Sequence, residues 1–193
     1  MRQIVRYLIG TNNEGIYLHP KEHSFDVWCD TSFAGDWEEK TAADDPMTAK
    51  SRSGYAITYA SCPIYWASKM KTEITLSTTE AEYVSLLQSV RVIPLMAFLQ
   101  EIQLRIDKKV ISMPTVHCTV FEDNSGALEL STVPKMRPRT KHINIKYHHF
   151  REHVRSKMIS VKLVTTENQI ADYLTKPLPV ETFQRHRKSL QGW

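Results

Sequence analysis

The chain has 193 residues, 41% of them hydrophobic and 24% charged, with 6 Gly and 9 Pro. This length suits one domain with short extensions, and this composition excludes a disordered or fibrous protein. The most apolar stretch, residues 90–99, contains Arg91 and Pro94 and falls short of the roughly 18–20 residues that cross a bilayer. We therefore expect no membrane span, and we expect no signal peptide because the first residues form no long apolar run.

Charge is unevenly distributed along the chain. Residues 134–193 carry 13 Lys and Arg against 4 Asp and Glu, a net charge of +9, while residues 1–133 have a net charge of −5. A basic last third is compatible with a phosphate-binding surface beside a carboxylate-bearing one, or with a solvated face alone. The three cysteines are widely spaced and form no CxxC pair, which favours reduced thiols in an intracellular protein over disulfides or a zinc ribbon.

In chain order, the first expected element is a short helix within residues 2–18, which leads into a turn at TNNEG. Three stretches rich in aromatic and β-branched residues then predict strands at 24–32, 53–60 and 63–69. These strands are close enough in sequence to form an antiparallel meander. The polar linker between the first two, GDWEEKTAADDPMTAK, contains a proline and predicts an exposed loop.

The sequence LSTTEAEYVSLLQSV has the i, i+3, i+4, i+7 spacing of one apolar helix face, formed by Tyr83, Leu86, Leu87 and Val90. Ser77 with Glu80, and equally Thr79 with Glu82, matches the capping box that opens a helix. Pro94 should break or kink this helix, and a second helical stretch should continue beyond it.

The second half of the chain alternates strands and helices. Residues 116–121 predict a strand followed by a helix at GALEL, residues 140–155 are helix-like or mixed, and residues 159–164 predict a fifth strand. Thr166 with Gln169 matches another capping box before a last helix at IADYLTK. This order predicts an α/β fold with a mixed five-stranded sheet, its three antiparallel strands first, and helices on both faces.

Four acidic residues stand out by their positions in these elements: Asp30, Glu82, Asp123 and Asp172. Asp30 and Asp123 lie at the ends of the first and fourth strands, and they become neighbours if the fourth strand inserts beside the first. The other two lie in the first turns of helices. Four carboxylates around one cleft repel unless a divalent cation neutralises them, which suits Mg²⁺. Two such ions roughly 4 Å apart could activate a water and stabilise the leaving oxygen of a phosphodiester.

Six strings carry a family resemblance, in the order CDTSFAGDW, SRSGYAITY, IYWASKMKTEITLSTTEAEY, EDNSGALEL, RTKHINIKYHHFRE and TTENQIADYLTKPL. Together they resemble the ribonuclease H domain at the C-terminal end of copia-type LTR retrotransposon polyproteins, over residues 24–178. Residues 1–23 resemble the connection that follows the reverse transcriptase domain in those polyproteins, and residues 179–193 are expected to form a basic C-terminal tail. No YxDD motif occurs, so the polymerase part is missing.

The resemblance implies a ribonuclease H-like fold and hydrolysis of the RNA strand of RNA/DNA hybrids during retrotransposon reverse transcription. It also implies two Mg²⁺ ions, which Mn²⁺ can replace, and an upstream reverse transcriptase domain as a partner. The family's ligand set falls on Asp30, Glu82, Asp123 and Asp172. Within TEAEY the family Glu is placed on Glu82, because an apolar helical stretch follows it, and Glu80 is left to the capping box. Glu122 is a less favoured alternative to Asp123.

Nucleic-acid contacts are expected from the residue after Asp123 and from the basic segment before the last strand: Asn124, Arg137, Arg139, Lys141 and His142. Asn124 is equally well interpreted as a helix cap. Asp36 and Glu73 lie near the acidic motifs and are interpreted as structural or solvated. The loop TTENQ lacks the mobile histidine of many cellular family members, which predicts slower turnover.

Three alternatives belong to other functional classes. A decayed retroelement fragment would bind nucleic acid without cleaving it, but all four carboxylates are intact. Integrase or transposase chemistry on a related fold needs a suitably spaced Asp and Glu pair that is missing here. His149 and His153 have the i, i+4 spacing of zinc ligands on a helix, but the adjacent Glu and a third ligand are lacking.

Overall fold

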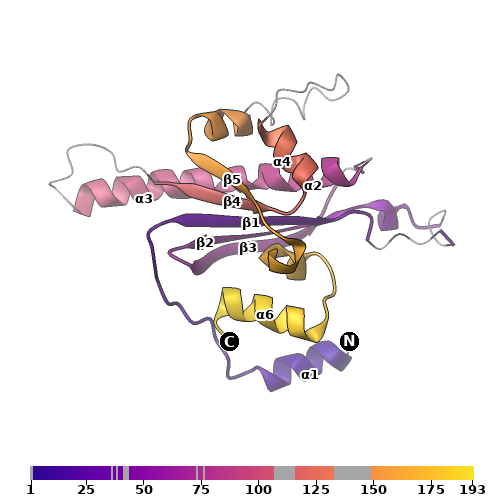
Figure 1. Cartoon of the computed structure of the whole chain (residues 1–193). Coiled ribbons are helices and arrows are strands. Elements are labelled where there is room, and N and C mark those ends of the chain that lie inside the picture. The colour runs from indigo at the N-terminus through magenta and orange to yellow at the C-terminus, as the bar shows by residue number, and fades with distance from the viewer. Residues whose placement is uncertain are drawn as a thin grey trace.

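The centre of the molecule is a mixed five-stranded sheet in the order β3-β2-β1-β4-β5 (Figure 1). The computed structural model describes residues 2–35, 37, 39–40, 44–72, 74–75, 77–106, 116–132 and 149–193. The strands are β1 Phe25–Ser32, β2 Arg52–Tyr59, β3 Cys62–Met70, β4 Cys118–Glu122 and β5 Ile159–Leu163. Their ends lie within two residues of the ranges expected from sequence. The predicted α/β fold with a mixed five-stranded sheet is confirmed.

The pairing of the strands brings two distant parts of the chain to one edge of the sheet. β1 and β2 are antiparallel, with Asp30 opposite Gly54, and β2 and β3 continue the antiparallel meander. β4 inserts beside β1 as a parallel strand, with Trp28 opposite Phe121, and β5 is parallel to β4. Because β1 and β4 run in the same direction, their carboxyl ends point to the same edge.

One face of the sheet is covered by two helices joined by a 3₁₀ turn: α2 Thr78–Leu86, the turn Leu87–Arg91 and α3 Val92–Ile106 (Figure 1). Ser77 caps α2, since its hydroxyl accepts a hydrogen bond from the Glu80 amide at 3.2 Å. Pro94 lies in the first turn of α3, where a missing amide proton removes no helical hydrogen bond. The break expected near Pro94 therefore takes the form of the 3₁₀ turn just before it.

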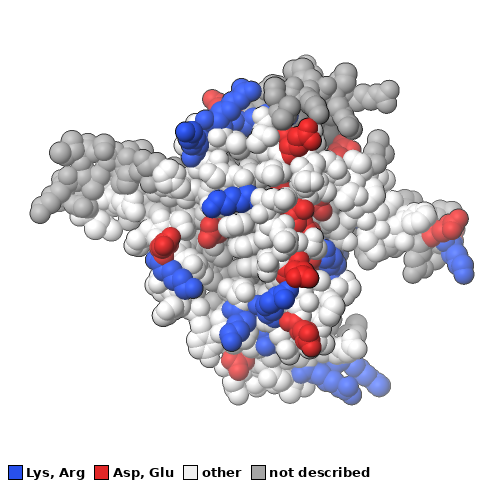
Figure 2. Space-filling view, viewed as in Figure 1, with Lys and Arg blue, Asp and Glu red and all other residues white. Residues whose placement is uncertain are grey.

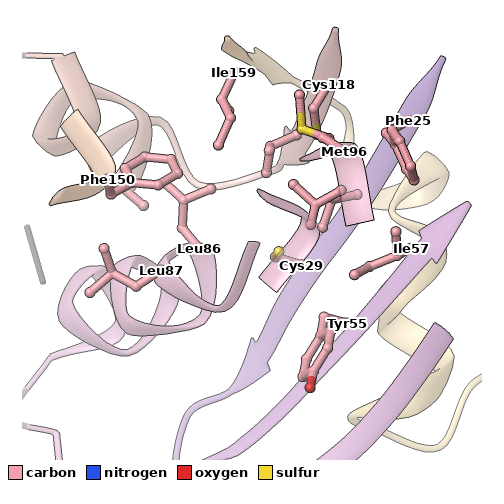
Figure 3. Close-up of a cluster of buried hydrophobic side chains, with 14 of the residues drawn as sticks. Phe25, Cys29, Tyr55, Ile57, Leu86, Leu87, Met96, Cys118, Phe150 and Ile159 are labelled. Carbon is pink, nitrogen blue, oxygen red and sulfur yellow. The ribbon is translucent and has the colours of Figure 1, made fainter. Parts of the chain in front are cut away.

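The hydrophobic core fills the space between this face of the sheet and its helices. Figure 3 shows Leu86 and Met96 from the helices close to Cys29 and Ile57 from the sheet. Helix α4, Ser125–Thr132, and the helical residues 149–155 complete this layer, with Phe150 fully buried. All three cysteines are buried and free, as the sequence indicates.

The stretch Thr78–Ile106 is long and apolar enough, by length and composition, to cross a membrane, with a mean hydropathy of 1.3. This differs from the expectation that no such stretch exists. The structure divides it at the 3₁₀ turn and buries Leu86, Val92 and Met96 in the hydrophobic core. Core helices meet the same criterion, so we assign this stretch to the core.

The opposite face of the sheet is covered by the last part of the chain. Two 3₁₀ turns, η3 Thr166–Asn168 and η4 Ile170–Leu174, precede helix α6, Val180–Gln191. Helix α1, Arg2–Gly10, lies against α6 on the side away from the sheet (Figure 1). The ring centroids of Tyr7 and Phe183 lie 5.9 Å apart and join these two helices.

Residues 179–193, predicted as a basic tail, form α6 instead. His186 and Leu190 on this helix are buried, with 2% and 4% of their surface exposed. The basic residues of this segment lie on a helix that packs toward β3 and η4. The domain limits at residues 23 and 178 stay a prediction.

Candidate active site

The candidate site lies at the edge of the sheet where the parallel strands β1 and β4 end. Asp30 lies two residues before the end of β1. Glu122 is the last residue of β4, and Asp123 follows it directly. Asp172 comes from η4 on one face of the sheet, and Glu82 comes from α2 on the other. Four segments far apart in the sequence thus bring five carboxyl groups together.

Three of these carboxylates approach one another closely enough to share a metal ion: Asp30, Asp123 and Asp172, here called the Asp triad. One ligand oxygen from each lies within 4.8 Å of the others. Asp30 and Asp172 are buried, with 2% and 3% exposed, while Asp123 is half-buried and reaches toward solvent. Hard divalent cations take carboxylate oxygens gathered in this way.

Each aspartate of the triad has a polar partner: Thr175 for Asp30, Thr166 for Asp123 and Lys176 for Asp172. The Thr166 hydroxyl donates at 2.9 Å, and the Lys176 ammonium lies 2.9 Å from the carboxylate oxygen. The Thr175 hydroxyl donates to Asp30 Oδ2. These contacts restrict the side-chain rotation of the three carboxylates, so the triad is held in place before any ligand arrives.

A close approach between β2 and η4 sets the position of Asp172. A Cβ added at Gly54 would lie 2.7 Å from Thr175 Cγ2 and 2.8 Å from Leu174 Cβ. Gly54 pairs with Asp30 across the sheet, so the lack of a side chain at this point lets η4 pack directly beside the first aspartate. Nothing in the local sequence pattern marks this glycine as part of the site.

The buried side chain of Gln169 ties η4 to the two strands that carry the other aspartates. Its Nε2 donates to the carbonyl of Cys29 in β1 at 2.9 Å and lies 3.4 Å from the carbonyl of Phe121 in β4. Its Oε1 accepts from the amide of Ala171 at 3.3 Å. One amide side chain therefore aligns all three segments of the Asp triad.

The capping box predicted for Thr166 and Gln169 is wrong, and so is the helix predicted at IADYLTK. The Thr166 hydroxyl bonds Asp123, and Gln169 itself caps η4. The segment forms two short 3₁₀ turns because these polar side chains have tertiary partners on the strands that compete with helix capping.

Two further carboxyl groups, Glu82 and Glu122, lie deeper than the Asp triad and are here called the Glu pair. They are 6% and 0% exposed, and among the described residues the Oε2 atom of each has no hydrogen-bond partner. Burial, followed by the charges of Asp30 and Glu122, raises the pKa of Glu82 to about 10. Burial raises the pKa of Glu122 to about 9, although the Asn124 amide donates to its Oε1 at 3.2 Å.

Comparisons with known proteins identify relatives of the whole chain. It is 36% identical over 186 residues to the retrovirus-related Pol polyprotein from transposon RE1 of Arabidopsis thaliana, covering 95% of this chain. It is 32% identical over 185 residues to the corresponding polyprotein from transposon TNT 1-94 of Nicotiana tabacum. The chain is homologous to part of these transposon Pol polyproteins. It spans 12% and 13% of their lengths, and no family model matches it.

Comparison with solved structures shows the fold of this chain. The N-terminal RNase H domain of Rv2228c from Mycobacterium tuberculosis matches it with a TM-score of 0.51 and 12% identity, over 87% of this chain and 99% of that one. LC11-RNase H1, isolated from compost, matches with a TM-score of 0.49 and 17% identity, over 80% and 94% of the two chains. The chain has the ribonuclease H fold, and the predicted resemblance to a transposon polyprotein is confirmed.

The electrostatics of the candidate site favour a bound cation. Burial and then the charge of Asp30 raise the pKa of Asp172 to about 7, against the lowering effect of Lys176. Burial also raises the pKa of Asp123, which the Thr166 hydrogen bond opposes. Carboxyl groups with raised pKa values, two of them with unpartnered buried oxygens, fit a divalent cation that would supply the missing positive charge.

Lys71 is a site residue that sequence reasoning missed. Its ammonium donates to the carbonyl of Ala81, the residue before Glu82, at 2.5 Å, and Thr31 donates to the same carbonyl at 3.2 Å. Burial lowers the pKa of Lys71 to about 8, although Glu82 and Glu122 oppose that shift. Lys71 therefore anchors the first turn of α2 and places positive charge beside the Glu pair.

The structure brings together three of the four carboxylates predicted as ligands, and their roles stay a prediction. The Asp triad converges, Glu82 lies beside it, and Glu122 is closer to the cluster than expected. Asn124 caps α4, since its Oδ1 accepts from the Ala127 amide at 2.9 Å. The other expected residues lie outside the described part of the chain: Arg137, Arg139, Lys141, His142, Asp36 and Glu73.

The described surface carries charges of both signs around this site. On the face that Figure 2 shows, Lys and Arg side chains of the described residues alternate with Asp and Glu side chains. Lys176 contacts Asp172 and keeps 36% of its side-chain surface exposed. The basic segment expected to contact phosphates falls mostly on residues 133–148, which the structure does not describe.

Proposed function

We propose that this chain is a metal-dependent ribonuclease H that cleaves the RNA strand of RNA/DNA hybrids during reverse transcription of a retroelement. The Asp triad, set on a ribonuclease H fold, is the observation that carries the proposal. We further propose that the chain acts intracellularly with a linked reverse transcriptase domain, since its relatives are Pol polyproteins and its cysteines are free.

In this proposal the Asp triad and Glu82 hold two Mg²⁺ ions, which Mn²⁺ can replace. The ions would supply a lowered pKa for the attacking water and charge stabilisation for the leaving oxygen. The residues of the chain do the positioning: Thr175 and Thr166 orient two aspartates, and Gln169 aligns the strands that carry them. Glu122 is given no ligand role in this proposal, since its Oε1 already accepts a hydrogen bond from the Asn124 amide.

Substrate binding in this proposal depends on polar and basic groups beside the Asp triad. Lys176 is exposed enough to leave Asp172 and meet a phosphate once a cation has taken its place. Arg137, Arg139, Lys141 and His142 remain proposed contacts to the nucleic-acid backbone, and Asn124 a proposed contact to a ribose hydroxyl beside its capping role.

The test is cleavage of a hybrid with labelled RNA in Mg²⁺, comparing the wild type with Asp123→Asn. Asparagine keeps the size of the side chain and removes its charge, so the variant should bind the hybrid and fail to cut it. The matched control is Asp26→Asn, an aspartate on β1 outside the triad, which should cut normally. Equal cleavage by the wild type and Asp123→Asn would refute the proposal.

The same experiment separates the alternative of a silent nucleic-acid-binding remnant. Such a protein would bind the hybrid in a salt-dependent way and release no RNA fragments in either Mg²⁺ or Mn²⁺. The structure gives no reason for silence, because every carboxylate of the expected ligand set is present and the triad converges.

A further inference from the structure

The second place where metal-ligating side chains converge is the outer face of the helical residues 149–155. His149 and His153 lie one turn apart on this helix, and their Nε2 atoms are 3.4 Å from each other. The two rings are nearly perpendicular, with an interplanar angle of 80°. The imidazoles therefore meet through their nitrogen atoms and are not stacked face to face.

The distance between the two nitrogens matches the distance between two ligand atoms of a tetrahedral metal ion. Two imidazole nitrogens bound at about 2.0–2.1 Å to tetrahedral Zn²⁺ lie about 3.3–3.4 Å apart. A hydrogen bond from a ring N–H would normally be shorter, at about 2.7–3.2 Å. The observed 3.4 Å thus suits a shared metal better than a direct hydrogen bond.

The backbone that carries the histidines is fixed on its other side. Phe150 is fully buried, and the guanidinium of Arg151 donates to the carbonyl of Leu130 at 2.8 and 3.1 Å. At the end of the helix, the carbonyl of His153 accepts from the Met158 amide at 3.1 Å. The pair is therefore presented from a rigid helix, which lowers the entropic cost of binding an ion.

The surroundings of His149 and His153 leave the imidazole nitrogens accessible to an ion. His149 is exposed and His153 half-buried, so an ion can reach both rings from solvent. Burial and then the neighbouring His149 lower the pKa of His153, which favours the neutral imidazole, while Glu152 opposes this shift.

We propose that His149 and His153 form a two-point binding site for a borderline transition-metal ion, of the class Zn²⁺, Cu²⁺ or Ni²⁺. Imidazole nitrogen suits these ions, whereas Mg²⁺ prefers the oxygen ligands of the Asp triad. Water completes the coordination, so the ion fastens one turn of the helix and has no catalytic part. The site is independent of the proposed nuclease activity, since it shares no residue with the Asp triad.

Zinc titration by calorimetry on the full chain, free of any histidine tag and in excess Mg²⁺, tests the proposal. The excess Mg²⁺ competes with Zn²⁺ for the carboxylates and does not compete for the imidazole nitrogens. Either His149→Gln or His153→Gln removes one arm of a two-point attachment and should weaken Zn²⁺ binding by about 10²-fold. His117→Gln, an exposed histidine elsewhere on the surface, should bind Zn²⁺ like the wild type.

A second readout uses Cu²⁺ as the probe. The paramagnetic resonance spectrum of the Cu²⁺-loaded wild type should show coupling to two imidazole nitrogens, and that of His149→Gln should show one. Equal Zn²⁺ affinity of the wild type and both glutamine variants would overturn the proposal. A Cu²⁺ spectrum unchanged by His149→Gln would overturn it as well.

Discussion

The Asp triad and the Glu pair contain the same chemical group within one site, yet their surroundings differ. Each aspartate of the triad has a hydroxyl or ammonium partner, and Asp123 is open to solvent. The glutamates are more deeply enclosed, and each has a buried oxygen without a hydrogen-bond partner among the described residues. The consequence is a higher pKa for the Glu pair, about 10 and 9, than for Asp172, about 7.

This difference teaches that proximity alone does not make a carboxyl group a ligand. Asp172, with a pKa of about 7, can supply negative charge to a cation near neutral pH, while the Glu pair keeps its protons until a cation is close enough to displace them. Glu82 and Glu122 differ in turn, because α2 carries Glu82 toward the site whereas the Asn124 amide engages Glu122 from behind. We therefore expect Glu82 to act as a metal ligand and Glu122 to remain an uncharged side chain beside the site.

The largest expected effect comes from removing charge within the triad. Asp30→Asn should lower hybrid cleavage by at least about 10³-fold, because metal ligands supply several kcal/mol of transition-state stabilisation. Glu122→Gln replaces a protonated carboxyl by an amide of similar shape and should retain activity within about tenfold of the wild type. Cleavage rates in Mg²⁺ measure both, and equal losses would remove the distinction between the two groups.

The second effect tests how the triad is assembled. Gly54→Ala places a Cβ against Thr175 and Leu174 and should destabilise the fold by about 1–3 kcal/mol, as overpacking does. Because η4 must shift, Mg²⁺ affinity measured by calorimetry should fall as well. Gly15→Ala is the matched control, since an added Cβ there meets nothing within 4 Å. Unchanged melting temperature and Mg²⁺ affinity in Gly54→Ala would contradict the role assigned to this contact.

The third effect concerns the stability of the metal-free protein as pH rises. The Glu pair has folded-state pKa values raised from 4.5 to about 10 and 9, so the unfolded chain releases these protons first. Stability should therefore fall from about pH 4.5 up to about 9 for Glu122 and up to about 10 for Glu82, with a slope of up to about 1.4 kcal/mol per pH unit for each group. Denaturant unfolding in a chelator should show this slope, and Glu82→Gln should reduce it. A slope identical in both proteins would count against the pKa assignment.

The smallest effect is expected at the rim of the triad. Lys176→Met removes a cation that competes for Asp172, so Mg²⁺ should bind a few-fold more tightly in the absence of nucleic acid. The gain is modest because solvent screens this partly exposed ammonium. Lys188→Met, on the exposed side of α6, is the control and should leave Mg²⁺ affinity unchanged. Weaker Mg²⁺ binding in Lys176→Met would show that the lysine supports the triad and does not compete for it.

The fold could be predicted from sequence because its strands and its first caps are local signals. Alternating aromatic and β-branched residues mark β1 to β3, and Ser77 caps α2 through a contact three residues away. Asp30, Asp123 and Asp172 could be assigned because each stands in a string that resembles a known family, and the structure brings them together.

The rest of the site depends on contacts that no local pattern records. Gln169 reads as a helix-capping residue in sequence, but its partners are strand carbonyls up to 140 residues away. Gly54 looks like an ordinary strand glycine until η4 packs against it. The position of Lys71 relative to the acidic motifs does not distinguish it from the other lysines. Only the packing of α2 against the sheet places it beside Glu82.

The hydrogen bonds of Gln169 to β1 and β4 have a consequence for the order in which the site forms during synthesis. Asp172 on η4 is translated some 140 residues after Asp30, together with Gln169, whose side-chain amide aligns the two segments. A nascent chain can pair β1 with β2 and β3 long before this point. The Asp triad is complete only once synthesis has passed η4.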